Sequence, residues 1–127
     1  MIFDILPKAD LVPGSELLIR GPYGLQPIYT FGEGDILQLR GQIFGVIGDY
    51  RDATYGRYKL IVIQYKNSVD ARSVFTNLLI NLDPYLTLLD QSKNHFSFKD
   101  FQDKFGLVEL NKDVMQIRIK LDKKPVF

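Results

Sequence analysis

The chain contains no cysteine, and this absence removes several kinds of chemistry at once. Without thiolates there is no cysteine nucleophile, no zinc–thiolate site and no iron–sulfur cluster. The only histidine, His95, cannot by itself build a histidine-rich transition-metal site. The lack of cysteine does not decide the redox compartment, because exported bacterial proteins often lack cysteine as well.

A strong net charge and a long apolar run are missing too. Sixteen Lys and Arg residues against 15 Asp and Glu residues leave a net charge of +1, so bulk charge does not indicate a polyanion-binding surface. No run of about 18 apolar residues is present, and we therefore expect no transmembrane segment. The first ten residues have neither the basic region nor the long apolar region of a signal peptide, so Met1 is either a native start or one placed where a leader was removed.

The residues that are present favour a folded core. The chain has 127 residues, of which 46% are hydrophobic, and it includes nine Phe and seven Tyr residues. This length fits one domain, and the apolar content can form a core without a disulfide or a metal. We expect residues 1–127 to form a single globular domain.

Short strands separated by turns account for much of the pattern. Residues 41–51 and 56–66 read as two strands around the turn "DATY", and the second is apolar on both faces, as a central strand would be. "ELLIR" (16–20) is a plausible first strand, and "GLVEL" and "VMQIRIKL" flank the turn "NKD". In residues 114–121, four apolar residues alternate with polar ones, which predicts a half-buried strand with Gln116, Arg118 and Lys120 on its outer face.

Three segments carry helical signals. Residues 67–83 have a capping Asn67 or Ser68, Asp70 in the first turn, and an apolar stripe at three- and four-residue steps. "HFSFKDFQDKFG" (95–106) resembles a second, short helix with a capping box, and "ILQLR" (36–40) a third. The predicted fold class is α+β, a single domain with a mainly antiparallel sheet and two or three helices packed chiefly on one face.

The loop "FGEGD" is the candidate ligand-binding site, with residues Gly32, Glu33, Gly34 and Asp35. It matches no phosphate or calcium motif: Leu37 stands where a dinucleotide fingerprint needs glycine, and Asp35-Ile36 where a phosphate loop needs Lys and a hydroxyl residue. The structural alternative is a turn in which the glycines allow unusual φ values and Asp35 caps a short helix over residues 36–40. Both interpretations remain open at this point.

No catalytic or metal-ligating residue can be assigned. A Ser-His-Asp arrangement would have to use His95 with Ser92 or Ser97, but neither serine lies in a nucleophile-elbow pattern. Paired carboxylates for glycoside hydrolysis have no support from spacing, although four acidic residues could converge: Glu33, Asp35, Asp49 and Asp52.

The tyrosines and basic residues of "DYRDATYGRYK" (49–59) raise the question of nucleic-acid binding. The strand-then-helix order is similar to an RNA-recognition motif, but the two base-stacking positions are then Leu60 and Val62, which cannot stack on bases. We therefore predict no nucleic-acid partner.

The order of several loose motifs from residue 3 to about residue 121 resembles a domain of uncharacterised bacterial proteins, many exported or lipoprotein-like. These motifs are Leu6-Pro7, "IYTFGEGD" (28–35), a strand ending in Tyr50, "LIVIQY", Asp70-Ala71 with Val74-Phe75, and "VMQIRI". The resemblance implies an α+β domain, often outside the cytoplasm, and brings no catalytic residues. Some small proteins of this kind carry a label as nucleotide- or GTP-binding regulators.

We therefore expect a non-enzymatic binding or structural module for a protein or small-ligand partner, with no cofactor. The alternative is a regulatory GTP-binding module that lacks a standard phosphate loop and uses Gly32–Asp35. The resemblance favours an extracytoplasmic location if a leader was removed, and a cytoplasmic one otherwise. The sequence sets neither the oligomeric state nor the partner.

Overall fold

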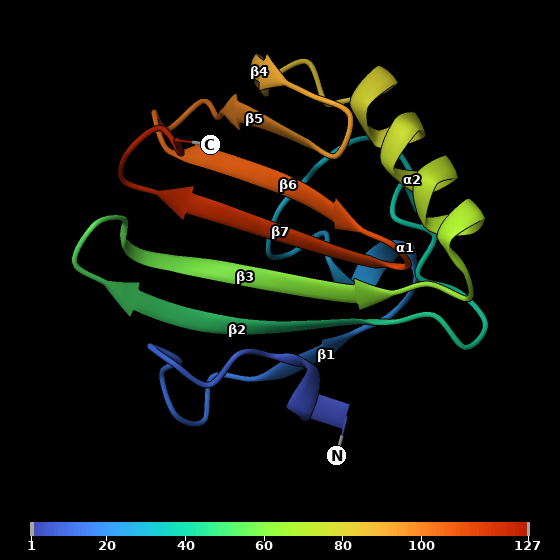
Figure 1. Ribbon diagram of the computed structural model, residues 1–127, viewed down its shortest axis with the longest axis horizontal. Coiled ribbons are helices and arrows are strands. Elements are labelled where there is room, and N and C mark those ends of the chain that lie inside the picture. The colour runs from blue at the N-terminus through green and yellow to red at the C-terminus, as the bar shows by residue number, and fades with distance from the viewer. Residues whose placement is uncertain (1, 127) are drawn as a thin grey trace.

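One antiparallel sheet of seven strands organises the chain (Figure 1). The computed structural model describes residues 2–126, and the strand order is β1-β2-β3-β7-β6-β5-β4. The strands are β1 Leu17–Ile19, β2 Gly45–Asp52, β3 Gly56–Gln64, β4 Thr87–Gln91, β5 His95–Lys99, β6 Phe105–Asn111 and β7 Val114–Leu121. The strands expected from residues 16–20, 41–51, 56–66, 106–110 and 114–121 are confirmed, and β3 is central as predicted.

The helix content is lower than predicted. Residues 2–126 contain one helix longer than about a turn, α2 (Ser68–Ile80), together with the four-residue α1 (Gly21–Gly24) and the 3-10 turn η1 (Ile2–Ile5). Asn67 caps α2 through a hydrogen bond from Asp70 N to Asn67 Oδ1 of 2.8 Å, as its sequence predicts. The α+β class is therefore right, but the expectation of two or three helices is wrong. No helix in the described part of the chain is long and apolar enough to cross a membrane.

The predicted second helix, residues 95–106, is instead strand β5, a turn and the start of β6. Phe96 and Phe98 are fully buried on one face of β5. Their spacing of two residues is the repeat of a strand, whereas a helix would bury residues three or four apart. Asp100 caps the hairpin turn, because its Oδ1 accepts hydrogen bonds from Gln102 N (2.8 Å) and Lys104 N (3.0 Å). Asp100 therefore caps a turn. It stands three residues after Ser97, which is the spacing that a capping box at the start of a helix would also have.

The larger core lies on the back face of the sheet, as seen in Figure 1, under α2 and the segment 25–43. Buried side chains of α2 pack with those of β5, β6 and β7 in this core: Ala71, Val74, Phe75, Leu78, Phe96, Phe98, Val108, Leu110, Met115, Ile117 and Ile119. Gly106 is required here, since a Cβ at this position would overlap the Phe98 ring across the strand pair. This core sets the position of the loops that surround the candidate sites.

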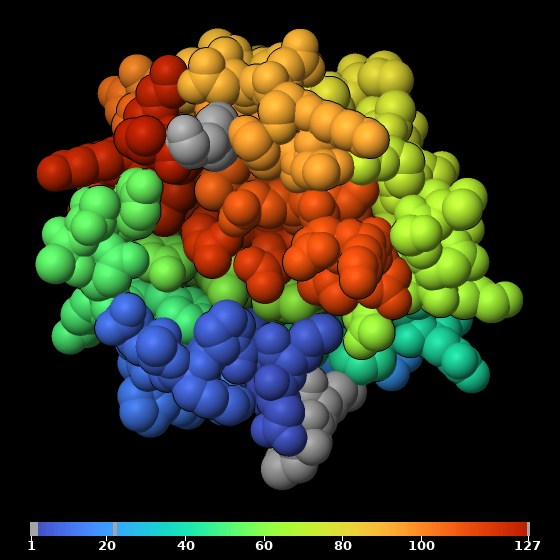
Figure 2. All heavy atoms as spheres, viewed as in Figure 1, coloured from blue at the N-terminus to red at the C-terminus, as the bar shows by residue number. Residues whose placement is uncertain are grey.

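A smaller core lies on the front face, where the N-terminal segment covers β2 and β3. Tyr50 and Tyr58 stack in it with ring centroids 5.6 Å apart, and the Tyr50 hydroxyl donates to Pro7 O (2.7 Å). Figure 2 shows side chains of the β6–β7 region at the surface between this segment and the β4–β5 hairpin. The front face is therefore covered over one half of the sheet and open over the other.

Candidate functional site

The predicted loop Gly32–Asp35 lies against the C-terminal end of α2. Asp83 N donates a hydrogen bond of 2.8 Å to Phe31 O, which holds the start of the loop to the segment just after the helix. A Cβ on Gly32 would overlap Ile36 and come within 3.0 Å of Asn81 O, so the first glycine allows a close approach of two backbones. Gly34 has a φ of +64° and open space around it, so the second glycine is favoured because of its left-handed backbone conformation and not because a side chain would clash.

Asp35 caps a turn and not a helix. Its Oδ1 accepts from Leu39 N (2.9 Å) and its carbonyl accepts from Gln38 N (2.9 Å). Gln38 has a φ of 54°, which a helix over residues 36–40 would not allow, so the expected "ILQLR" helix is wrong. The structural role expected for Asp35 as a cap is retained in a different local structure.

A hollow of about 580 Å³ borders this loop, and we name it the acidic hollow. Its lining residues come from the loop and from the end of α2: Gly32, Glu33, Ile36, Asn77, Ile80, Asn81, Leu82, Asp83 and Pro84. The C-terminal end of a helix carries a partial negative charge, and Glu33 and Asp83 add to it. These surroundings disfavour a phosphate group, which binds at helix N-termini and beside basic side chains.

Three of the four carboxylates considered for acid–base chemistry, Asp35, Asp49 and Asp52, have separate structural partners. Asp49 pairs with Lys59 (2.6 Å), and Asp52 Oδ1 accepts from Thr54 N and Tyr55 N in the β2–β3 turn. Within residues 2–126 no group of three or more His, Asp or Glu side chains could hold a metal ion.

His95 begins β5, and its ring nitrogens lie 2.9 and 3.2 Å from Ser92 Oγ, while Ser92 N donates to His95 O (2.8 Å). These contacts close the β4–β5 hairpin. Ser97 is buried and its hydroxyl accepts from Asp90 N (3.3 Å), so it also belongs to the hairpin.

Two of the three tyrosines in the stretch 49–59 are buried and present no base-stacking surface. Tyr50 is 2% exposed and Tyr58 is 8% exposed, and Leu60 and Val62 are buried in the same front core. Burial raises the pKa of Tyr50 to about 12, and the neighbouring Tyr58 adds to this effect. These rings could meet a nucleic-acid base only if the front core opened.

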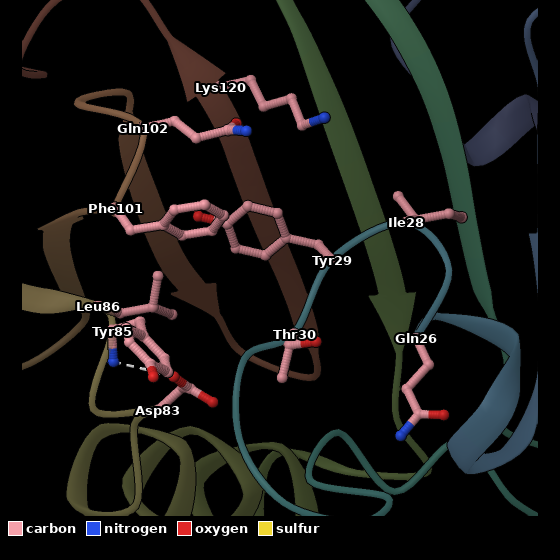
Figure 3. A pocket seen from close by; sticks show the side chains of 10 residues that line it. All are labelled: Gln26, Ile28, Tyr29, Thr30, Asp83, Tyr85, Leu86, Phe101, Gln102 and Lys120. Atoms are coloured by element: carbon pink, nitrogen blue, oxygen red, sulfur yellow. Dashed lines mark hydrogen bonds between the residues drawn. The ribbon is translucent and has the colours of Figure 1, made fainter.

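A second hollow was not predicted, and we name it the aromatic hollow (Figure 3). It has a volume of about 450 Å³, which is within the range of small-molecule sites. Three loop segments and one strand residue meet around it, and its lining residues are Gln26, Ile28, Tyr29, Thr30, Asp83, Tyr85, Leu86, Phe101, Gln102 and Lys120. Asp83 borders both hollows, so they are neighbours.

Tyr29 is fixed on one side of the aromatic hollow by the buried Asp100. Its hydroxyl donates to Asp100 Oδ2 (3.0 Å), while Asp100 Oδ1 is occupied by the backbone of the β5–β6 turn. Burial raises the pKa of Tyr29 well above its usual value, and the charge of Asp100 raises it further. The ring is therefore held in place by a hydrogen bond that links the segment 26–30 to the β5–β6 turn.

Two exposed aromatic side chains stand beside the aromatic hollow. Tyr85 is 74% exposed and Phe101 is 75% exposed, although their rings contact each other with centroids 6.4 Å apart. Figure 3 shows Phe101 beside Tyr29 and Tyr85 nearer to Asp83. An aromatic residue inside a polar turn, as in "KDFQDK" (99–104), is the sequence signal that could have indicated this site.

No protein-family model, curated protein sequence or solved structure matches the chain. The resemblance to a domain of exported bacterial proteins therefore stays a prediction.

Proposed function

We propose that the protein is a non-enzymatic binding module that takes a small, largely apolar ligand in the aromatic hollow. The observation that carries this proposal is the pair Tyr85 and Phe101, which remain about three-quarters exposed next to a hollow with apolar and aromatic walls. Exposed aromatic rings around a concave surface are typical of ligand sites, because covering them removes apolar area from water.

The lining supports binding in preference to catalysis. Its polar groups are two tyrosine hydroxyls, two glutamines, one threonine, one lysine and Asp83, and the Asp83 Oδ1 accepts from Tyr85 N (2.9 Å) in its own turn. These groups can orient a ligand through hydrogen bonds and charge. A nucleophile with an adjacent base, which covalent catalysis requires, is not among the lining residues.

Titration with indole tests the proposal, since the chain contains no tryptophan and indole emission therefore reports the ligand alone. We expect a dissociation constant on the order of 1 mM, which corresponds to about −4 kcal/mol for such a small probe. Amide chemical shifts should change in residues 26–30, 83–86 and 100–103. Phe101→Ala should weaken binding several-fold, while the matched control Tyr23→Ala, at a residue 76% exposed on α1, should not. Indole that binds elsewhere, or not at all, contradicts the proposal.

The nucleotide-binding alternative rests on the Gly32–Asp35 loop, and native mass spectrometry with GTP and Mg²⁺ tests it directly. A bound mass that is lost in Gly34→Val would support that alternative.

A further inference from the structure

The most informative feature beside the aromatic hollow is a β-bulge in β7. Strict alternation would place Lys120 on the same face as Arg118 and Leu121 on the same face as Ile119. The structure has the opposite arrangement, because Leu121 packs in the front core and Lys120 lines the hollow on the back. The register explains this: Phe105 pairs with Leu121 but Leu107 pairs with Arg118, so one extra residue is accommodated in β7.

Lys120 adopts a backbone conformation that L-residues rarely take. Its φ is 65°, in the left-handed region where a Cβ is unfavourable and glycine is the usual occupant. Strain of this kind often accompanies function, and here it has one local result: it turns a lysine from the front face into the aromatic hollow.

The ammonium group of Lys120 has no hydrogen bond or ion pair to any other residue of the range 2–126. Five other lysines of this range pair with a carboxylate, and the three shortest of these contacts are Lys59 to Asp49 (2.6 Å), Lys104 to Asp122 (2.6 Å) and Lys124 to Asp90 (2.9 Å). In Figure 3 the Lys120 side chain extends at one end of the hollow, Asp83 lies at the other end, and the aromatic rings lie between them. The hollow therefore has one cationic end, one anionic end and an aromatic middle.

We propose that the aromatic hollow selects small aromatic carboxylates, with the ring against Tyr29, Tyr85 and Phe101 and the carboxylate at Lys120. The inference rests on the proposed function, since it specifies the ligand of the same hollow. A lysine ammonium attracts a carboxylate, and the opposite end repels it because of Asp83, so charge sets the orientation of the ligand. The same arrangement disfavours an aromatic amine at the Lys120 end.

The test compares three probes of nearly equal shape by fluorescence titration: indole-3-acetate, the neutral indole-3-acetamide and the cationic tryptamine. We expect the acetate to bind about two- to fivefold more tightly than the amide at low salt, as for a partly exposed charge pair. This preference should shrink at high salt, because screening shortens the range of the charge interaction.

Variants separate the role of Lys120 from its effect on the fold. Lys120→Gln should remove the preference for the acetate over the amide, while Lys120→Arg should keep this preference. Lys112→Gln is the matched control, because Lys112 is an exposed lysine with a φ of 57° in the β6–β7 turn. Its loss changes the net charge equally and should leave the preference intact.

The outcomes distinguish the two proposals. Equal binding of acetate and amide, with both weakened by Phe101→Ala, overturns the carboxylate inference and leaves the proposed function standing. A preference for the acetate over the amide that persists in Lys120→Gln overturns the inference as well, since a group other than Lys120 then interacts with the carboxylate. If none of the three probes binds, both proposals fail.

Discussion

The two neighbouring hollows share Asp83 but differ in what they can attract. The acidic hollow is bounded by the C-terminal end of α2, by Glu33 and by Asp83, with no basic side chain in its lining. The aromatic hollow has apolar walls and one lysine without a partner in the described part of the chain. The comparison shows that glycines and acidic residues in a loop do not define an anion site, because the charge of the surrounding elements decides.

Near each hollow, a tyrosine hydroxyl forms a hydrogen bond that holds a loop in place. Tyr29 donates to Asp100 at the aromatic hollow, and Tyr65 donates to Leu37 O (2.8 Å) behind the acidic one. Burial raises the pKa of both phenols above the usual value of 10. The two loops are thus fixed in similar ways, and the difference between the hollows lies in the groups that face solvent.

The largest expected effect on stability distinguishes the buried residue behind the aromatic hollow, Phe98, from the exposed residue at its edge, Phe101. Phe98 is fully buried behind Tyr29 and Phe31, with ring centroids 6.4 and 6.3 Å away, so Phe98→Ala should cost about 3–5 kcal/mol in unfolding free energy. Phe101→Ala, on the exposed turn, should cost less than about 0.5 kcal/mol although it weakens ligand binding. Urea unfolding of both variants measures this, and similar costs would show that Phe101 is part of the core.

Tyr29→Phe should reduce stability by about 1.5–3 kcal/mol near neutral pH, because the hydrogen bond to a charged carboxylate is lost. The pKa of Tyr29 is raised in the folded parent protein. The stabilisation that this hydrogen bond provides is therefore fully present below about pH 10 and is lost as the pH rises further. The variant should therefore lose less stability than the parent between about pH 10 and pH 12. Thermal unfolding over this range checks the prediction, and parallel pH profiles would contradict it.

Gly34→Val should cost about 1–2 kcal/mol, since Gly34 has a φ of +64° and no neighbouring atoms that a Cβ would meet. Because this change lies at the acidic hollow, indole binding at the aromatic hollow should not change. Calorimetry and indole titration of one sample measure both quantities. If GTP binds the parent protein and not this variant, the contrast in charge that we draw between the hollows is incorrect.

Lys120→Gly has the smallest expected effect on stability, and the effect is of opposite sign. Removing the side chain relieves the left-handed strain but adds freedom to the unfolded chain, so we expect a net gain of about 0.5–1 kcal/mol. A gain in stability together with a loss of carboxylate preference would show that the strain is retained for binding. Lys112→Gly should give a similar gain in urea unfolding without any effect on ligand selection.

The sequence predicts most of the fold, and the exceptions have physical reasons. Hydrophobic alternation and turn residues locate five of the strands, and the Asn67 cap locates α2. Residues 95–106 mislead because Asp100 stands three residues after Ser97 in a hairpin turn, as it would in a capping box. The order of the strands depends on pairing between distant segments, which local patterns do not contain.

The candidate site is harder to predict than the fold. Tyr29, Tyr85, Phe101 and Lys120 are far apart in sequence and come together only when the sheet has formed. Alternation places Lys120 on the wrong face, since a bulge is not visible in the pattern of apolar residues. The Gly32–Asp35 loop can be found from the sequence because its glycines and acidic residues are consecutive. A pattern of four consecutive residues does not show which distant residues surround the loop, so it does not identify a ligand.

The strand order also has a consequence for how the chain folds. Every strand pair joins neighbours in the sequence except β3–β7, where Lys59 pairs with Ile119 and Gln64 with Val114. The hairpins on either side can form through local contacts, but joining them closes the longest loop and bears the largest entropic cost. We expect this junction to limit the folding rate, and amide protons along β3 and β7 to exchange only when the whole sheet opens.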